Sequence, residues 1–387
     1  MNYCRKLSHA VPAPFAGEFI ARVYYLNAAI RKVNLEPIAR QTVELEIADD
    51  NTTTIESLGL KIDHVLDSIV SKNREFAPRV LAQRQSTATP RLNSPMDWLV
   101  QHGHIHEFGP GRVGLGPLLV ALENRIDGDL LQMAQTLGAV PYRFPTVIGA
   151  DVLSKCRYLQ SFPQFLTLAM HLNENMDVLS QFSQECRVLD GAVVVPEGSL
   201  APSTTVLSPT VCFHLYSWLE GQELNGPMSV TAKGHCHRYE SRTMSGLERL
   251  WDFQMREIMF VGSSEHVEKQ RTDCLEQCIC LLDKWNITYE IISATDPFYV
   301  DGFSAVANYQ AAFELKYEIR VPLPYAPGRT MAIGSINRHH DFFGKSLNFK
   351  DKNISGYSHT ACVGFGLERV AWAWLCTHGV DPDLWPR

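Results

Sequence analysis

Residues 235–262 read HCHRYESRTMSGLERLWDFQMREIMFVG, and this stretch decides how the rest of the chain is interpreted. The segments at about 235–242 and 251–262 read as extended chain. A polar loop between them carries Ser245-Gly246, residue types that are typical of a hairpin turn. The stretch therefore predicts two strands joined as a hairpin.

The alternation of side chains along a strand predicts what one face of this hairpin carries. Arg238 and Glu240 would share one face of the first strand, and Phe253, Met255 and Glu257 one face of the second. An arginine fork suits a phosphate, a phenylalanine ring can stack on a base, and a glutamate is a hard anionic ligand. The alternative is an ordinary hairpin with a solvated charged face, because such faces are common.

The order of residues in the hairpin resembles motif 2 of class II aminoacyl-tRNA synthetases, and of seryl-tRNA synthetases in particular. The matching residues are Arg-Tyr-Glu at 238–240 and Gly-Leu-Glu-Arg-x-x-x-Phe-x-x-x-Glu at 246–257. Residues 360–377, with Gly364-Phe-Gly-Leu-Glu-Arg369, resemble motif 3. The resemblance implies an α/β (α+β) fold in which helices flank an antiparallel sheet.

A third segment, 116–149, resembles motif 1 of the same family. It combines a long amphipathic helix, expected over 116–137, with an extended piece that contains two prolines, a residue type that suits an edge or interface strand. Motif 1 forms the dimer interface in class II synthetases. The resemblance therefore implies a homodimer.

Composition and charge set the broad class. The chain has 387 residues, 45% hydrophobic and 20% charged, a net charge of −7 and a pI near 6.1, which argues against a surface dominated by nucleic-acid contacts. It contains no run of about 20 apolar residues and no signal-peptide pattern at its start, so we expect a cytoplasmic protein without a membrane segment. The ten cysteines are then reduced thiols or metal ligands.

The chain divides into two expected parts. Residues 95–387 read as one catalytic core, and residues 1–94 as an N-terminal helical extension of unknown role, with helices near 16–33 and 54–72 and a linker at 83–94. This extension holds twelve Lys and Arg against ten Asp and Glu, so it is not a basic arm.

Several His and Cys clusters could suggest a metal, but none has the spacing of a structural zinc motif. The clusters are His102, His104 and His106; His235, Cys236 and His237; Cys274, Cys278 and Cys280; and His339-His340. The resemblance implies a different, dispersed site, because zinc-dependent seryl-tRNA synthetases of the archaeal type and the related amino acid:[carrier protein] ligases hold zinc with Cys, Glu and Cys. The matching residues are Cys212, Glu257 and Cys362. The alternative is two core cysteines and a solvated glutamate.

The resemblance also assigns roles toward ATP. It implies that Arg238 binds the α-phosphate and the substrate carboxylate, Glu240 the adenine amino group, and Arg369 the γ-phosphate, while Phe253 stacks on adenine. Arg249 is a weaker phosphate candidate.

One stretch departs from the seryl-tRNA synthetase pattern. Residues 332–335 read Ala-Ile-Gly-Ser where that family has Glu-Ile-Ser-Ser, so Ala332 replaces a glutamate that helps to hold metal-bound ATP. The usual handling of Mg²⁺ is therefore in doubt. Asn337, just beyond, is a candidate for binding the amino acid.

The acceptor of the activated amino acid distinguishes a carrier-protein ligase from a seryl-tRNA synthetase. Pro37 and the turn-like residues 49–54 break the N-terminal segment, so it does not read as the long basic two-helix arm that grips tRNA. The carrier-protein ligases lack that arm and resemble the chain at 156–163, 255–258 and 296–298. We therefore expect activation of a small amino acid, glycine or alanine, and its transfer to the phosphopantetheine of a carrier protein. A divergent zinc-dependent seryl-tRNA synthetase and a non-catalytic pseudo-synthetase are the rival functions.

Overall fold

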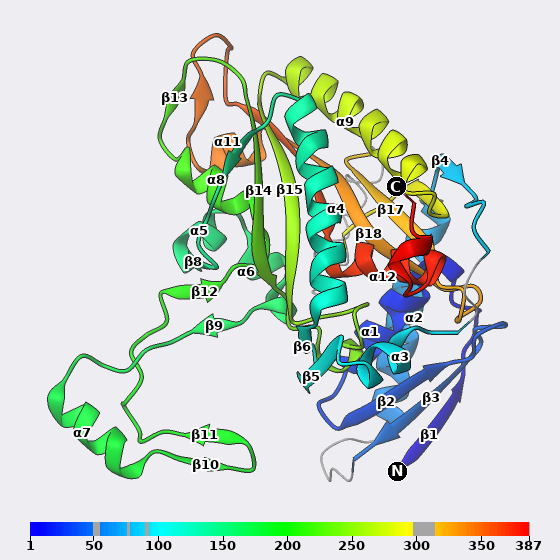
Figure 1. Ribbon diagram of the computed structural model, residues 1–387. Coiled ribbons are helices and arrows are strands. Elements are labelled where there is room, and N and C mark those ends of the chain that lie inside the picture. The colour runs from blue at the N-terminus through cyan, green and yellow to red at the C-terminus, as the bar shows by residue number, and fades with distance from the viewer. Residues whose placement is uncertain (49–54, 76–77, 90–92, 297–313, 387) are drawn as a thin grey trace.

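A computed structural model describes residues 1–48, 55–75, 78–89, 93–296 and 314–386, and the turn at 49–54 and most of the 296–298 segment lie outside these ranges. Its centre is an eight-stranded sheet in the order β4-β16-β17-β18-β20-β15-β14-β7 (Figure 1). All neighbours are antiparallel except β14 and β7. The strands are β4 (Val80–Arg84), β7 (Val140–Tyr142), β14 (Met228–His237), β15 (Asp252–Gly262), β16 (Tyr289–Ser293), β17 (Lys316–Pro322), β18 (Thr330–His340) and β20 (His359–Gly366).

Two hydrophobic cores lie on the two faces of this sheet. The first packs under α4 (Pro117–Thr136), α9 (Ser264–Lys284) and α12 (Leu367–His378), the three long helices beside the sheet in Figure 1. The second packs under the short helices α5 (Ala150–Lys155), α8 (Cys212–Trp218) and α11 (Phe342–Ser346). Along β15, Ile258 and Phe260 enter the first core, and Met259 and Val261 enter the second. The central strand is thus buried on both faces, which confirms the mixed α/β fold with an antiparallel sheet.

The smaller elements of the core complete the frame. They are α3 (Met96–Gln101), β5 (Ile105–Gly109), β6 (Arg112–Leu115), β8 (Val147–Gly149), α6 (Tyr158–Ser161), β9 (Leu168–Ala169), β12 (Thr205–Leu207), β13 (Glu223–Leu224) and β19 (Lys350–Asp351). The expected helix at 116–137 is confirmed as α4. The hairpin is also confirmed, since β14 pairs antiparallel with β15 from Met228↔Val261 to His237↔Asp252.

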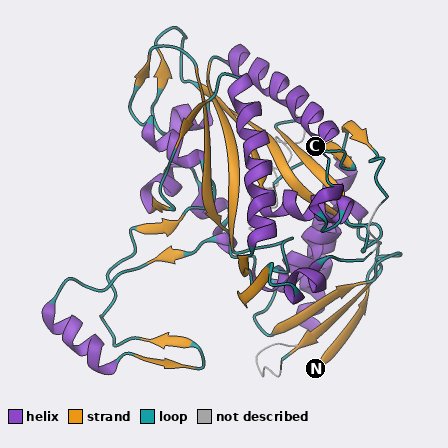
Figure 2. Cartoon of the chain, in the orientation of Figure 1, coloured by secondary structure: helices purple, strands orange, loops and turns teal. Residues whose placement is uncertain are grey.

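The N-terminal segment differs from its prediction, because it is not helical throughout. It contains a three-stranded antiparallel sheet, β1-β3-β2, as well as two helices (Figure 2). The elements are β1 (Asn2–Lys6), α1 (Ala16–Tyr24), β2 (Ile30–Leu35), β3 (Thr42–Ile47) and α2 (Ile55–Glu75). The predicted helix at 16–33 stops at Tyr24, and the Asn27 side chain accepts a hydrogen bond from the Ala29 N–H (2.6 Å) in a turn before β2.

A core of its own holds this N-terminal unit together. Val43, Leu45 and Ile47 alternate with exposed glutamates along β3 and pack against Phe19 of α1 and Ile62 of α2. Strand alternation therefore decides the structure of a stretch for which only helices were expected. We use the term N-terminal unit for the described residues of 1–75.

The expected linker at 83–94 also needs correction. Strand β4, which ends at Arg84, pairs with β16 at the edge of the central sheet. The chain after β4 stays on this edge. The Ser86 N–H donates to the Thr288 side chain, and the Thr87 N–H donates to the Asn286 side chain. The central sheet therefore takes one strand from before residue 95.

An arm formed by residues 168–203 projects from the other side of the core (Figure 1). It carries α7 (Met176–Glu185) and the hairpin of β10 (Arg187–Leu189) and β11 (Ala192–Val194). Helix α7 has no buried residue, and Met176 is 80% and Val188 70% exposed. Local hydrogen bonds, rather than a buried core, therefore stabilise α7 and its hairpin within this chain.

Candidate active site

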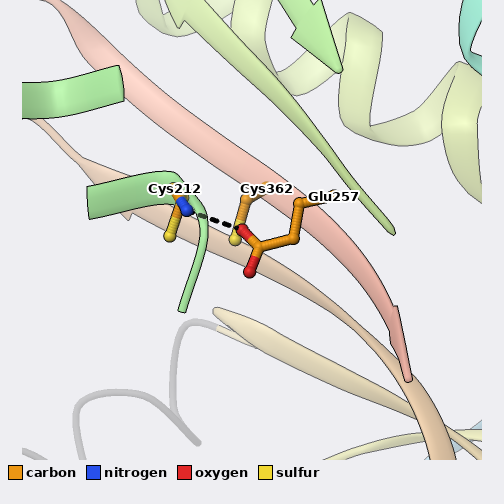
Figure 3. Close-up of side chains that lie close together, drawn as sticks. All are labelled: Cys212, Glu257 and Cys362. Carbon is orange, nitrogen blue, oxygen red and sulfur yellow. Dashed lines mark hydrogen bonds between the residues drawn. The ribbon is translucent and has the colours of Figure 1, made fainter. Parts of the chain in front are cut away.

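Three potential metal ligands meet on the face of the sheet that α8 covers. Cys212 begins α8, Glu257 lies in the middle of β15, and Cys362 lies on β20 beside it (Figure 3). One donor atom from each lies within 4.8 Å of the others, and the three residues are only 1–6% exposed. Among the residues that the structure describes, this is the one group of three or more His, Cys, Asp or Glu with such spacing.

The chain segment before α8 fixes the Glu257 carboxylate. Its Oε1 accepts hydrogen bonds from the Thr210 hydroxyl (2.5 Å) and the Val211 N–H (3.0 Å), and its Oε2 accepts one from the Cys212 N–H (3.0 Å) (Figure 3). A carboxylate has about four acceptor sites, so these bonds orient the group and leave a site for a further ligand.

Strand β18 supplies a second set of neighbours around Cys362. The Asn337 side-chain N–H donates to the Cys362 sulfur (3.6 Å) and to the Ser335 hydroxyl (3.1 Å). The His339 Nε2 lies 3.7 Å from the same sulfur, and its Nδ1 is held by the Thr360 hydroxyl at 3.1 Å. The structure therefore places the predicted Asn337 next to the donor cluster.

Burial and hydrogen bonding separate the pKa values of the two thiols. Burial raises the pKa of Cys212 well above its usual value, and the hydrogen bond from Cys212 is the main cause that lowers the pKa of Cys362. Burial also raises the pKa of Glu257, and the nearby Cys362 adds to this effect. Burial therefore disfavours the charged forms of Cys212 and Glu257, and a bound cation would favour them.

The residues assigned to ATP line a pocket next to this cluster. Arg238, Glu240, Phe253 and Arg369 all line it, together with Met255 and the glycines of the motif 3 strand. At Gly364 an added Cβ would lie 2.8 Å from the Met255 Cε and 3.3 Å from the Glu257 Cγ, so a side chain here would displace the end of Met255 and crowd Glu257. The pocket therefore joins the predicted motif 2 and motif 3 residues, while Arg249 is not among its lining residues.

Arg238 does not lie on a strand, because β14 ends at His237. Its N–H donates to the Trp251 carbonyl (2.9 Å), and its Nε donates to the Pro209 carbonyl (3.0 Å). The guanidinium carbon lies 5.5 Å from the centre of the Phe253 ring. Loop bonds, rather than strand alternation, thus bring Arg238 to the face that was predicted for it.

Glu240 and Arg249 form an ion pair across the loop between the two strands. The Arg249 Nη1 lies 2.6 Å from the Glu240 Oε2, and it also donates to the Thr243 hydroxyl (3.3 Å). The Glu240 side chain is 17% and the Arg249 side chain 33% exposed. The predicted adenine ligand is therefore paired with the weaker phosphate candidate.

Arg369 stands at the start of α12 with backbone carbonyls around it. Its Nε donates to the Glu248 carbonyl (2.6 Å) and its Nη1 to the Ala332 carbonyl (3.2 Å). The Glu248 side chain accepts from the Tyr325 hydroxyl (2.5 Å) and pairs with Arg329 (2.7 Å). The turn that holds Arg369 is thus itself anchored to the loop after β17.

The sequence did not single out several residues around the pocket. Glu318 lines it together with Ala332 and pairs with Lys316 (3.3 Å) and Arg320 (2.7 Å), so the adjacent strand β17 brings a carboxylate to a pocket where residue 332 offers none. The sequence also did not single out Thr210, two residues before Cys212. It indicated His339 only as part of the His339-His340 pair, although His339 follows Asn337 by two along a strand and therefore shares its face.

Within the described part of the chain, the other His and Cys clusters do not bring three donor atoms within 4.8 Å of one another. Cys274 and Cys278 are fully buried in the core under α9, and Cys280 is exposed. His235 lies 2.8 Å from Asp252 on the hairpin surface. No described helix is long and apolar enough to cross a membrane.

Comparisons of the sequence with known proteins point in one direction. Residues 203–377 match the tRNA synthetase class II core domain (G, H, P, S and T). The amino acid–[acyl-carrier-protein] ligase 2 of Bradyrhizobium diazoefficiens is 31% identical over 312 residues, which cover 79% of this chain and 90% of that protein. The type-2 serine–tRNA ligase of Methanopyrus kandleri is 27% identical, over 74% of this chain and 57% of its own length.

A comparison of structures agrees on the fold. The seryl-tRNA synthetase of M. kandleri, solved in complex with a selenocysteine tRNA of Aquifex aeolicus, superimposes with a TM-score of 0.71 and 20% sequence identity. The superposition covers 100% of this chain and 76% of the other. The class II synthetase fold therefore extends over the described core.

Proposed function

The chain belongs to the amino acid–[acyl-carrier-protein] ligase family, enzymes with a class II synthetase core, and we propose that it activates a small amino acid with ATP and transfers it to a carrier protein. One observation carries the proposal. A buried Cys-Glu-Cys cluster and a pocket lined by Arg238, Phe253 and Arg369 lie next to each other along β15. An amino acid bound at the Cys-Glu-Cys cluster would therefore lie next to ATP bound in the pocket.

In the proposed first step, a carboxylate oxygen of the amino acid attacks the α-phosphorus of ATP. A phosphorus–oxygen bond to the amino acid forms, the bond to the bridging oxygen breaks, and pyrophosphate leaves with that electron pair. Arg238 would hold the α-phosphate and the substrate carboxylate, Phe253 would stack on adenine, and Arg369 would bind the γ-phosphate. The positions of these three side chains around one pocket support the roles.

The proposed metal ligands are Cys212, Glu257 and Cys362, and the proposed ion is zinc. The donor set fits zinc, which takes thiolate and carboxylate ligands at about 2.0–2.3 Å. Three protein donors leave one position for the α-amino group of the substrate, which is the chemistry that zinc would supply. Asn337 would bind the same substrate, because its amide lies against Cys362. The low exposure of the donor cluster supports a short side chain, as in glycine or alanine.

Mg²⁺ remains part of the proposal as the companion ion of ATP. Ala332 supplies no ligand, and Glu318 is the carboxylate that we propose in its place because it lines the same pocket. Burial acts to raise the pKa of Glu318, but its partners Lys316 and Arg320 together outweigh burial and lower it, which would keep the carboxylate ionised.

In the proposed second step, the phosphopantetheine thiol of the carrier loses its proton to solvent, and its sulfur attacks the carbonyl carbon of the adenylate. A carbon–sulfur bond forms, the bond between the carbonyl carbon and the phosphate oxygen breaks, and AMP leaves with that electron pair. The name of the Bradyrhizobium relative supports a carrier protein as acceptor. We propose that tRNA is not the acceptor, because the N-terminal unit is a small helix-and-sheet unit and not a basic two-helix arm. The superposition of the whole chain on a tRNA-bound synthetase keeps a seryl-tRNA synthetase as the second candidate.

We also propose a homodimer in a reducing, cytoplasmic setting. Val140 and Val147, in the extended part of the motif 1 segment, are 57% and 39% exposed, which suits an interface. All ten cysteines are free.

Pyrophosphate exchange over the standard amino acids tests the first step. Transfer of the labelled amino acid to a phosphopantetheinylated carrier, with total tRNA as the parallel acceptor, tests the second. The proposal expects exchange with glycine or alanine and label on the carrier alone. Label on tRNA would support the synthetase, and ATP binding without exchange would support a pseudo-synthetase.

A further inference from the structure

The N-terminal unit packs directly on the loop that carries the proposed nucleotide ligands. Helix α1 lies against the short helix η3 (Ser241–Thr243), which follows Glu240 in the loop between β14 and β15. No role was assigned to the N-terminal unit from the sequence. Its position beside Glu240 and Arg249 raises the question of what it does there.

Tyr25, which follows α1, makes the central contact. Its single hydroxyl proton is shared between the Tyr239 and Gln164 carbonyl oxygens, each 3.2 Å from the hydroxyl oxygen. A tyrosine hydroxyl is protonated at neutral pH in any case, and burial, with a smaller effect of Glu240, raises the pKa of Tyr25 further, to about 12. Tyr239 is the residue between Arg238 and Glu240, so the bond holds the peptide that separates two proposed ATP ligands.

Two further contacts hold the same loop. Arg242 reaches back to the N-terminal unit, and its Nη2 donates to the Ala28 carbonyl (3.1 Å). At Gly17, in the first turn of α1, an added Cβ would lie 3.7 Å from the Arg249 Nη2. The N-terminal unit therefore contacts the loop beside Glu240 and at Arg242, and Gly17 lies near the head of Arg249.

The other side of Tyr239 is held by the core. Its N–H donates to the Phe165 carbonyl (3.1 Å), and its ring packs edge-on against Trp251, with the ring centres 5.0 Å apart. Tyr239 therefore has a fixed partner on the core side and Tyr25 on the N-terminal side. Removing the Tyr25 hydroxyl would release one side of this peptide while leaving the fold of both parts in place.

We propose that the N-terminal unit positions the nucleotide-binding loop, with Tyr25 as the positioning residue. The inference rests on the proposed function, because it takes Arg238 and Glu240 as ATP ligands. It predicts a specific kinetic signature. A loosened loop should weaken the capture of ATP and leave the rate of the bound complex nearly unchanged, since Tyr25 does not line the pocket.

Tyr25→Phe tests this inference in the full-length chain. Loss of one hydrogen bond predicts a rise of about five-fold in the KM for ATP in pyrophosphate exchange, with kcat changed less than two-fold. Tyr24→Phe is the matched control, because the Tyr24 hydroxyl accepts a bond from the Val33 N–H inside the N-terminal unit. The control should lower the melting temperature slightly and leave the KM for ATP unchanged. Arg242→Gln, on the opposite side of the contact, should raise the KM in the same direction.

An unchanged KM in Tyr25→Phe, or an equal rise in Tyr24→Phe, would overturn the inference. Calorimetric titration of each variant with ATP separates this result from failure of the proposed function. If the wild type binds ATP but exchanges no amino acid, the proposed function fails. Weaker ATP binding by Tyr25→Phe would then still support the positioning role, and equal binding would overturn it as well.

Discussion

The candidate site has two halves that differ in secondary structure: the metal-ligand half lies mainly on strands, and the nucleotide half lies mainly on a loop. Cys362 and Glu257 lie within neighbouring strands of the central sheet, and their Cα positions are fixed by the β15–β20 register. Arg238 and Glu240 instead follow the end of β14, and the Arg249 side chain holds Glu240 across the loop. The half built on strands is nearly closed to solvent, whereas the half built on the loop is partly open.

This difference indicates which part of the site is ordered before any ligand binds. Hydrogen bonds from Thr210, Val211 and Cys212 fix Glu257 without any ligand. The loop half depends on contacts between side chains and on the N-terminal unit. We expect changes in the strand half to abolish a step, and changes in the loop half to shift an affinity.

The largest effect should come from the donor cluster. Cys362→Ala removes a thiolate from a set of three ligands, so we expect the bound zinc to be lost and amino-acid-dependent exchange to fall by on the order of 100-fold or more. Metal analysis of the purified protein and the exchange rate measure the two results. Cys236→Ala is the control, because Cys236 is equally buried in the same core and is not in the cluster. Full zinc content in Cys362→Ala would contradict the assigned ligands.

Arg369→Gln should have the next largest effect. It removes a charged donor from the nucleotide pocket, and we expect exchange to fall by about 100-fold. Arg329→Gln is matched to it, since Arg329 also bonds Glu248 but its side chain is 62% exposed outside the pocket lining. Equal losses in the two variants would mean that the anchoring of the Glu248 turn, and not phosphate binding, explains the effect.

The ion pair in the loop should give a moderate and non-additive effect. Glu240→Gln and Arg249→Gln should each raise the KM for ATP by about ten-fold, and the double variant should do little more, with a coupling free energy of about 1–2 kcal/mol. Steady-state exchange of the four proteins measures this coupling. Strict additivity would show that the two residues act independently of each other.

The smallest effect on activity is expected at Glu368, which lines the nucleotide pocket and whose main consequence is a pH dependence of stability. The Glu368 carboxylate accepts the Gln254 N–H (2.8 Å), and burial, with repulsion from Glu123, raises its pKa to about 8. The folded protein therefore keeps a proton that the unfolded chain releases, so stability is full below about pH 4.5 and declines as the pH rises toward 8.

Glu368→Gln should remove part of this decline. One pKa unit corresponds to about 1.4 kcal/mol, so the wild type should lose on the order of 1–4 kcal/mol across this range through Glu368. Melting temperatures of both proteins at pH 5 and pH 8 measure the difference. Parallel pH profiles would show that Glu368 does not hold its proton. Glu123→Gln is a useful companion, since burial raises the pKa of Glu123 to about 7.

The sequence predicted which residues of the strand half lie together, and for a physical reason. Motif spacing specifies which residues lie on β15 and β20, and the antiparallel pairing then brings Glu257 and Cys362 together. Strand alternation could not place Arg238 and Glu240, because both lie beyond the strand. The resemblance named them, and only the loop bonds explain how they reach the pocket.

Other features depend on long-range contacts that no local pattern carries. Glu318 reaches the pocket because β17 pairs with β18, and His339 approaches Cys362 from the adjacent strand. In the N-terminal unit, Val43, Leu45 and Ile47 alternate with polar residues as a strand requires, although only helices were predicted there. The contact of Tyr25 with Tyr239 joins residues 214 positions apart, and no local sequence pattern predicts it.

The projecting arm implies that this chain does not have a single stability. A helix of ten residues and a two-stranded hairpin are each marginal in water when nothing packs on them. Opening α7 breaks its own backbone bonds and the cap from Asn175, and costs no core contact. Amide hydrogens in the arm should therefore exchange with solvent by local opening, while those of β15 should wait for the whole sheet to unfold.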